Sequence, residues 1–193
     1  MPGDDDHQVG LINETVCQLS QRSADEGIAE MRQGLADYAA TGAHLARPYF
    51  LAILAEALQN LGRVDDGLAV VSEAIEAGSG NGYYDAELYR LKGELTLKKH
   101  SASARAARPK RRGTTPLADA DAEEHLRKAM AIARRQRAKS LELRATMSLA
   151  RLWQQQGKHA QARQELAAIY GWFTEGFETR DLRAAIALLD ELA

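Results

Sequence analysis

The amino-acid sequence predicts an all-α fold, a solenoid of antiparallel helix pairs. Three observations support this prediction. Ala, Leu, Glu, Arg and Gln dominate the 193 residues, and proline occurs only 4 times. Those five side chains lose little rotamer freedom on a helix. Apolar residues recur at helical spacing along most of the chain. A pattern of small and large residues also returns at a regular interval, which is typical of helical repeats.

The overall composition narrows the class of protein. The chain carries 25 Lys and Arg against 27 Asp and Glu, a net charge of −2, so its total charge does not indicate binding to nucleic acid or to an anionic membrane. Cys17 is the only cysteine, which excludes an intrachain disulfide and favours a reducing compartment. No apolar run approaches the roughly 18 residues of a membrane helix, and the acidic start lacks the features of a signal peptide. We therefore expect a cytoplasmic protein without a membrane partner.

The first half of the chain is expected to form two helix pairs after a disordered N-terminus, residues 1–7. Ser23 opens a capping box with Glu26, which marks the start of a helix. Gly62 sits between two apolar stretches and predicts a tight turn. The predicted helices cover residues 9–21, 23–41, 49–61 and 64–77, giving units of about 8–41 and 45–78.

The second half is expected to form two more units and a cap. The units span about 83–136 and 139–170, and the cap covers 171–193, so that 8–193 is a single helical-repeat domain. Residues 100–116, HSASARAARPKRRGTTP, lack apolar periodicity and are predicted to be a flexible basic insertion. In the cap, we expect Trp172 and Phe173 to hold an amphipathic helix that covers the last pair. The apolar residues assigned to that cover are Leu182, Ile186, Leu189 and Leu192.

Small residues define the repeat. In the second helix of each pair, a small residue is followed four positions later by a large residue. In most units, a second small residue lies three positions after the large one. The four instances are Gly27-x3-Met31-x2-Gly34, Gly67-x3-Val71-x2-Ala74, Ala122-x3-Leu126-x2-Ala129 and Ala162-x3-Leu166-x2-Ile169. The step is 40 residues from Gly27 to Gly67 and again from Ala122 to Ala162, but 55 between Gly67 and Ala122. The surplus of 15 falls in the basic insertion.

This frame resembles the tetratricopeptide repeat over about residues 8–170, although its step of 40 exceeds the roughly 34 of that family. The resemblance implies antiparallel helix pairs with right-handed curvature. Longer strings resemble the C-terminal region of bacterial multidomain signalling ATPases and of transcriptional regulators with an adenylate/guanylate-cyclase-like domain. These strings are EGIAEMRQGLADYAATGAHLARPYFLAILAEAL, YDAELYRLKGELTL, AKSLELRATMSLARLWQQQGK and YGWFTEGFETRDLRAAIALLDEL. This resemblance implies a regulatory scaffold that holds an ATPase or cyclase-like module.

No motif indicates catalysis. The sequence has no phosphate-binding loop, its five histidines show no zinc-ligand spacing, and its serines lack a triad context. We therefore expect no enzymatic activity, no metal and no cofactor. The basic run from Lys98 to Arg112 has no aromatic residue for base stacking, which favours a solvated insertion over a nucleic-acid site.

The first helices of the pairs are expected to line a concave groove that binds a protein or an extended peptide. The predicted groove residues are Tyr49, Glu56, Gln59, Asn60, Glu87, Arg90, Glu94, Lys98, Arg144, Met147, Arg151, Gln154 and Gln155. A plain solvated face, a small-molecule effector in the groove and a second copy of the chain remain open alternatives. Replacing both Arg144 and Arg151 by Glu is expected to abolish binding without unfolding the chain.

Overall fold

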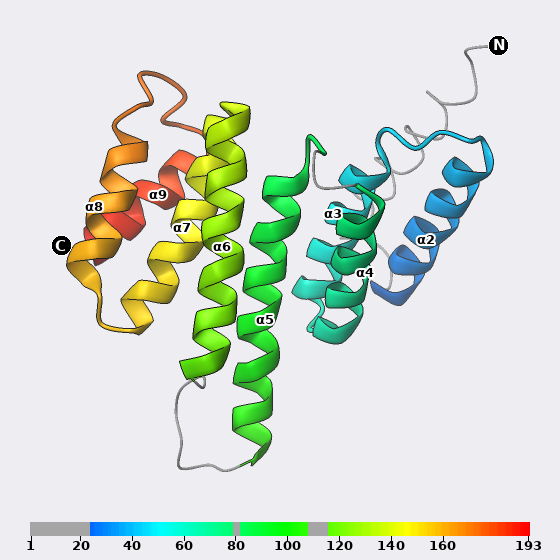
Figure 1. Ribbon diagram of the computed structural model, residues 1–193, viewed down its shortest axis with the longest axis horizontal. Helices are drawn as coiled ribbons and strands as arrows, with labels where there is room; N and C mark the ends of the chain where they lie inside the picture. Colours follow the sequence, from blue (N-terminus) through cyan, green and yellow to red (C-terminus); the bar gives the residue numbers. More distant parts are fainter. Residues whose placement is uncertain (1–23, 79–81, 108–115) are drawn as a thin grey trace. The chain divides into compact units, whose positions relative to one another are not determined.

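A computed structural model describes residues 24–78, 82–107 and 116–193, and these residues form eight α-helices and no strand (Figure 1). The all-α prediction is therefore confirmed for this part of the chain. The predicted disordered residues 1–7, the predicted helix 9–21 and Cys17 lie outside the described residues. The chain divides into two compact units, residues 1–84 and 85–193, which we describe separately.

Unit 1 contains α2 (Ala24–Ala40), α3 (Arg47–Asn60) and α4 (Val64–Ala77). A three-residue connection joins α3 to α4, and the two helices pack side by side, while α2 packs against α3 (Figure 1). The prediction of a helix pair around Gly62 is confirmed. The largest buried side chains of this unit are Ile28, Met31, Leu35, Tyr38, Phe50, Leu51, Leu54, Leu58 and Val71.

Unit 2 contains α5 (Asp85–Ala107), α6 (Pro116–Gln136), α7 (Lys139–Gln155), α8 (His159–Tyr170) and α9 (Arg180–Glu191). The helices α5 and α6 pack as one pair and α7 and α8 as the next, as Figure 1 shows. The first helices α5 and α7 also contact each other, and α9 packs on both α7 and α8. The main buried cluster includes Leu126, Leu143, Leu149, Leu152, Trp153, Leu166, Leu182 and Leu188.

The repeat frame coincides with the core. In α6, the frame residues Ala122, Leu126 and Ala129 are completely buried. A Cβ atom added to Gly93 of α5 would lie 2.8 Å from Cγ of Leu126 and 3.1 Å from the carbonyl oxygen of Ala122. Small residues therefore recur where two helices of a pair approach most closely.

The turns within the pairs also repeat. Gly62 and Gly157 both have a positive φ, +74° and +76°, and each follows the C-terminus of a first helix. The next residue then closes the turn, since the Arg63 N–H donates to the Leu58 carbonyl at 2.9 Å. The equivalent bond from Lys158 to Trp153 measures 2.8 Å. Glycine suits this position because a left-handed backbone carries no penalty without a Cβ atom.

The prediction of a loop over residues 100–116 is wrong at both of its ends. Helix α5 continues to Ala107 and α6 begins at Pro116, while 108–115 lie outside the described residues. The stretch lacks apolar periodicity, but that pattern indicates a core-facing helix rather than helix in general. Its Ala and Arg residues nevertheless favour helix, and proline is well tolerated at the first position of a helix. Most of the insertion therefore lengthens the α5–α6 hairpin.

The cap prediction is correct for α9 and wrong for two of its residues. Leu182, Leu188 and Leu192 are buried, but Ile186 is 40% exposed and Trp172 is 57% exposed. The buried stripe follows helical spacing through Ala185, which leaves Ile186 on the outer side of α9. Trp172 follows the C-terminus of α8 and lies against Phe173 rather than within the core. Truncating Trp172 should therefore cost much less than the 3 kcal/mol or so typical of a buried aromatic.

Candidate functional site

Unit 2 brings four of the predicted groove residues together as ion pairs. The guanidinium of Arg90 binds both carboxylate oxygens of Glu87, with Nε–Oε2 at 2.9 Å and Nη2–Oε1 at 2.6 Å. Its third nitrogen, Nη1, donates to Glu94 Oε1 at 2.6 Å. From α7, Arg144 Nη1 lies 3.1 Å from Glu87 Oε1. These four charges therefore bind one another across α5 and α7.

Two further residues complete this arrangement, and the sequence analysis did not identify either. Ser148 Oγ of α7 donates to Glu94 Oε1 at 2.6 Å. Arg144 Nε lies 3.8 Å from Asp181 Oδ2, near the start of α9. Ser148 follows Arg144 by four residues and so shares its helix face, a signal that was available in the sequence. We call Glu87, Arg90, Glu94, Arg144, Ser148 and Asp181 the α5–α7 charge network.

Two members of the network are buried, and this limits which substitutions the network can accept. Glu87 and Arg90 are each 7% exposed, so their charges depend on the partners that surround them. Arg144→Glu would place a third carboxylate beside Glu87 and Asp181. Because this change removes a cation that neutralises a buried anion, we expect Arg144→Glu to destabilise the fold as well as to alter the surface.

The remaining predicted residues of unit 2 fall into two groups. Met147 is 5% exposed and belongs to the core, so its assignment to the groove is wrong. Lys98, Arg151 and Gln155 are exposed, while Gln154 is partly buried and donates from Nε2 to Glu191 at 3.3 Å. Arg151 and Gln155 follow Ser148 along one face of α7 at helical spacing. They extend the charge network with side chains that solvent reaches.

The predicted residues of unit 1 lie on α3. Asn60 is exposed, Glu56 is partly buried and Gln59 is 8% exposed. The ring of Tyr49 lies 4.9 Å from that of Tyr84. Burial raises the pKa of the Tyr84 phenol, and the neighbouring Tyr49 and Tyr83 raise it further. The raised pKa keeps the Tyr84 phenol protonated, and its ring contacts those of Tyr49 and Tyr83.

A second ionic cluster lies at the turn between α6 and α7. Glu142 is 4% exposed and accepts hydrogen bonds from Arg134 Nε at 2.7 Å and from Lys139 Nζ at 2.8 Å. Burial by itself raises the pKa of Glu142, but the bonds from Lys139 and Arg134 outweigh it, and the net pKa is lowered. Glu142 therefore remains ionised and holds Lys139 in place.

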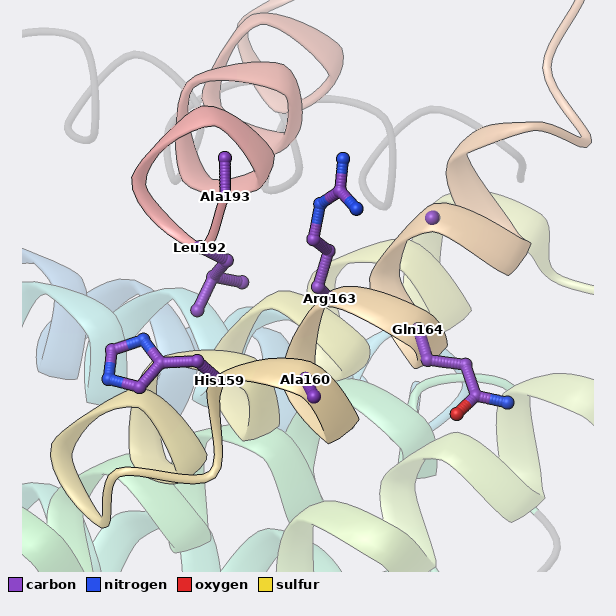
Figure 2. A pocket seen from close by; sticks show the side chains of 7 residues that line it. His159, Ala160, Arg163, Gln164, Leu192 and Ala193 are labelled. Atoms are coloured by element: carbon purple, nitrogen blue, oxygen red, sulfur yellow. The ribbon is translucent and has the colours of Figure 1, made fainter.

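An open hollow of about 480 Å³ lies between α8 and the end of α9 (Figure 2). Figure 2 shows Leu192 and Ala193 facing the side chains of α8, with His159 and Arg163 beside them. The lining residues are His159, Ala160, Arg163, Gln164, Ala167, Leu192 and Ala193. The sequence analysis did not predict this hollow, which is largely apolar with polar side chains at its rim.

The described residues also bear on metal binding and on insertion into a membrane. In the described ranges, no three His, Cys, Asp or Glu side chains lie close enough together to hold a metal ion. Within the same ranges, no helix is both long and apolar enough to cross a membrane.

Comparison with known proteins adds information about the fold. No protein-family model and no curated protein matches the chain. Among solved structures, it is similar to a Podosopora anserina protein described as a kinesin light chain with nearly identical TPR-like repeats. The TM-score is 0.63 at 17% sequence identity, and the match covers 100% of this chain and 87% of the other. At this identity the likeness concerns the fold alone, and the chain has a TPR-like, all-α helical-repeat fold.

Proposed function

We propose that this chain is a non-catalytic protein-interaction scaffold that binds a protein or an extended peptide along α5 and α7. The observation that carries the proposal is the α5–α7 charge network with its exposed extension. Buried ion pairs fix Glu87, Arg90 and Arg144 on two adjacent first helices. Arg151 continues the same face of α7 and is exposed.

Such a surface suits a polar, extended ligand. Because the buried Glu87 and Arg90 hold the partly exposed Glu94 and Arg144 in place, these two side chains lose little additional entropy when a partner binds. The partly exposed members of the network, Glu94, Arg144 and Asp181, present both signs of charge to solvent. Mixed charge favours a partner of complementary pattern and disfavours one of a single sign.

The wider context is also part of the proposal. The strings that resemble the C-terminal region of bacterial signalling ATPases support a role as the regulatory helical-repeat module of such a protein, in the cytoplasm. The partner segment would then belong to an ATPase or cyclase-like module. Gene context identifies the candidate module, either within the same polypeptide or in an adjoining gene.

The experiment is a pull-down of the candidate ATPase module with the wild-type chain and with Arg151→Glu, Gln155→Glu. Both side chains are exposed, so the melting temperature should remain unchanged. We expect the double variant to lose at least about tenfold in affinity, which corresponds to roughly 1.4 kcal/mol. Arg135→Glu, an exposed charge reversal on α6, is the control and should bind like the wild type.

Equal binding by all three proteins would contradict the proposal. A small-molecule effector is the alternative function, and a thermal-shift screen against metabolites tests it in the same variants. An effector that raises the melting temperature of the wild-type chain but not of the double variant would assign the face to a sensor instead, because ligand binding stabilises the native state by mass action.

A further inference from the structure

A second surface lies on different helices, at the connection between α8 and α9. We propose that the segment from Tyr170 to Thr179, here called the aromatic loop, docks a cationic amphipathic helix of a partner protein. This inference is independent of the surface on α5 and α7. It follows from three features of the loop: the support of its exposed rings, the order of its backbone and the sign of its charge.

Each exposed ring of the loop rests against a ring that packs on the core. Trp172 is 57% exposed and lies edge-on to Phe173, with the ring centroids 5.2 Å apart and an interplanar angle of 87°. Phe177 is 45% exposed and lies 5.9 Å from Tyr170. Both Phe173 and Tyr170 pack against the main buried cluster of unit 2. The loop therefore presents two apolar rings to solvent from a fixed base.

The backbone of the loop is hydrogen-bonded at both ends. The Phe173 N–H donates to the Tyr170 carbonyl at 3.1 Å, and the Thr179 N–H donates to the Gly176 carbonyl at 2.9 Å. Gly176 has a φ of +76°, which allows the chain to reverse before α9. A partner would meet rings that are already positioned, so that less conformational entropy is lost on binding.

Charge determines which partner fits. Glu175 and Glu178 are both exposed, and the loop contains no Lys or Arg. Among the described residues, neither carboxylate takes part in an ion pair. An acidic segment would meet like charge at Glu175 and Glu178, whereas Lys and Arg side chains would find two exposed carboxylates within three residues of Phe177.

One cation already uses the Trp172 ring. Lys139 Nζ lies over this ring, 5.5 Å from its centroid, while Glu142 holds the same ammonium group at 2.8 Å. The contact demonstrates that the ring accepts a cation within the range of cation–π attraction. With 57% of Trp172 still exposed, a second cation or an apolar side chain can reach the ring. Tryptophan is also one of the residue types enriched among the hot spots of protein interfaces.

The two tryptophans allow a direct test. Trp153 is 3% exposed, so the Trp153→Phe variant leaves Trp172 as the only indole that reports on the loop. The probe is a helix-forming peptide of Leu and Lys with one apolar face, and its counterpart carries Glu in place of Lys. We expect the Lys peptide to shift Trp172 emission to the blue with saturation, and the Glu peptide to leave it unchanged.

Charge reversal then tests the acidic contribution. The double variant Glu175→Lys, Glu178→Lys should bind the Lys peptide with an affinity at least about tenfold lower. Glu76→Lys with Glu124→Lys changes the net charge equally at exposed positions on α4 and α6, and this control should bind as before. The Trp172→Phe variant, which retains Trp153, should show no shift.

Three outcomes would overturn the proposal. The two peptides could shift the emission equally, which would show that charge does not select the partner. The control double variant could lose as much affinity as the loop variant, which would indicate only a long-range effect. Vesicles of anionic phosphatidylglycerol could cause the shift when the Lys peptide does not, which would assign the rings to a lipid surface.

Discussion

Residue 137 departs from the turn chemistry of the other helix connections. Arg137 lies between α6 and α7 with a φ of +56°. In the turns within the pairs, the residues with a positive φ are glycines, Gly62 and Gly157. The Ala138 N–H donates to the Ala133 carbonyl at 2.9 Å, which reproduces the closing bond of those glycine turns. A side chain in the left-handed conformation costs about 1–2 kcal/mol. Arg137 therefore introduces strain that the glycine turns avoid.

This strain predicts opposite effects for two exchanges. Arg137→Gly should raise the free energy of unfolding by about 0.5–1 kcal/mol, because the relief of strain exceeds the greater entropy of glycine in the unfolded chain. Gly157→Ala should lower it by about 1 kcal/mol for the reverse reason. Urea unfolding of both variants beside the wild type measures the two changes. A destabilised Arg137→Gly would mean that the arginine side chain contributes more than its backbone costs.

At the scale of single residues, the sequence predicts the positions of apolar residues better than the contacts of charged ones. The frame residue Leu126 is buried as its spacing indicates, because burial of an apolar residue depends mainly on the helix face that carries it. Arg144 was expected to be available to a partner. Its bonds to Glu87 and Asp181 join three helices, and the sequence alone does not specify which opposite charges meet. Trp172 was misplaced because a large apolar residue can be exposed as well as buried.

At the scale of the helices, α5 and α6 approach each other closely at Gly93. Gly93 faces Leu126 and Ala122 across this interface, where a Cβ atom would come within 3.1 Å of the backbone oxygen of Ala122. Exchanging glycine for alanine within a helix is normally stabilising by about 1 kcal/mol, owing to helix propensity. At Gly93 the overlap with the neighbouring helix should reverse that sign.

We therefore predict that Gly93→Ala destabilises the chain by about 1–3 kcal/mol, the usual cost of overpacking. Adding Leu126→Val should recover part of the loss, since the nearest overlapping atoms belong to the leucine side chain. Chemical denaturation of the two single variants and the double variant gives the coupling energy between the positions. Additive effects would show that the two residues do not compete for the same space.

The length of α5 could have been anticipated from the repeat frame. Ala55 of α3 and Gly93 of α5 are buried small residues of two first helices, 38 positions apart. With the same shift, the position that corresponds to the turn glycine Gly62 is His100. Without glycine at this position, nothing favours the left-handed turn, and α5 continues through it. The missing apolar periodicity instead favoured a loop. Apolar periodicity indicates contact with a core, whereas a stretch without it is still helical where its residues have high helix propensity.

At the scale of the whole chain, stability is distributed among neighbouring helices. Every residue of the main buried cluster of unit 2 belongs to α6, α7, α8, α9 or the end of the chain, with Tyr89 and Leu97 of α5 packed against it. The fold class followed from the sequence because a repeated frame constrains each pair in the same way. The identity of the binding partner does not follow from the sequence, since the fold places no constraint on exposed residues such as Arg151.

A repeat array with local contacts should remain folded when it is divided between units. We predict that residues 85–193, produced alone, give a helical circular dichroism spectrum and one cooperative unfolding transition, because this unit contains its own buried cluster. A matched fragment, residues 85–171, lacks α9. It should melt at a clearly lower temperature, since Leu182, Leu188 and Leu192 would no longer cover α7 and α8. An unfolded 85–193 fragment would instead establish that the chain folds only as a single domain. Equal melting temperatures of the two fragments would contradict the role of α9 as a cap. Exposing the apolar faces of α7 and α8 to solvent would then leave the stability of the unit unchanged.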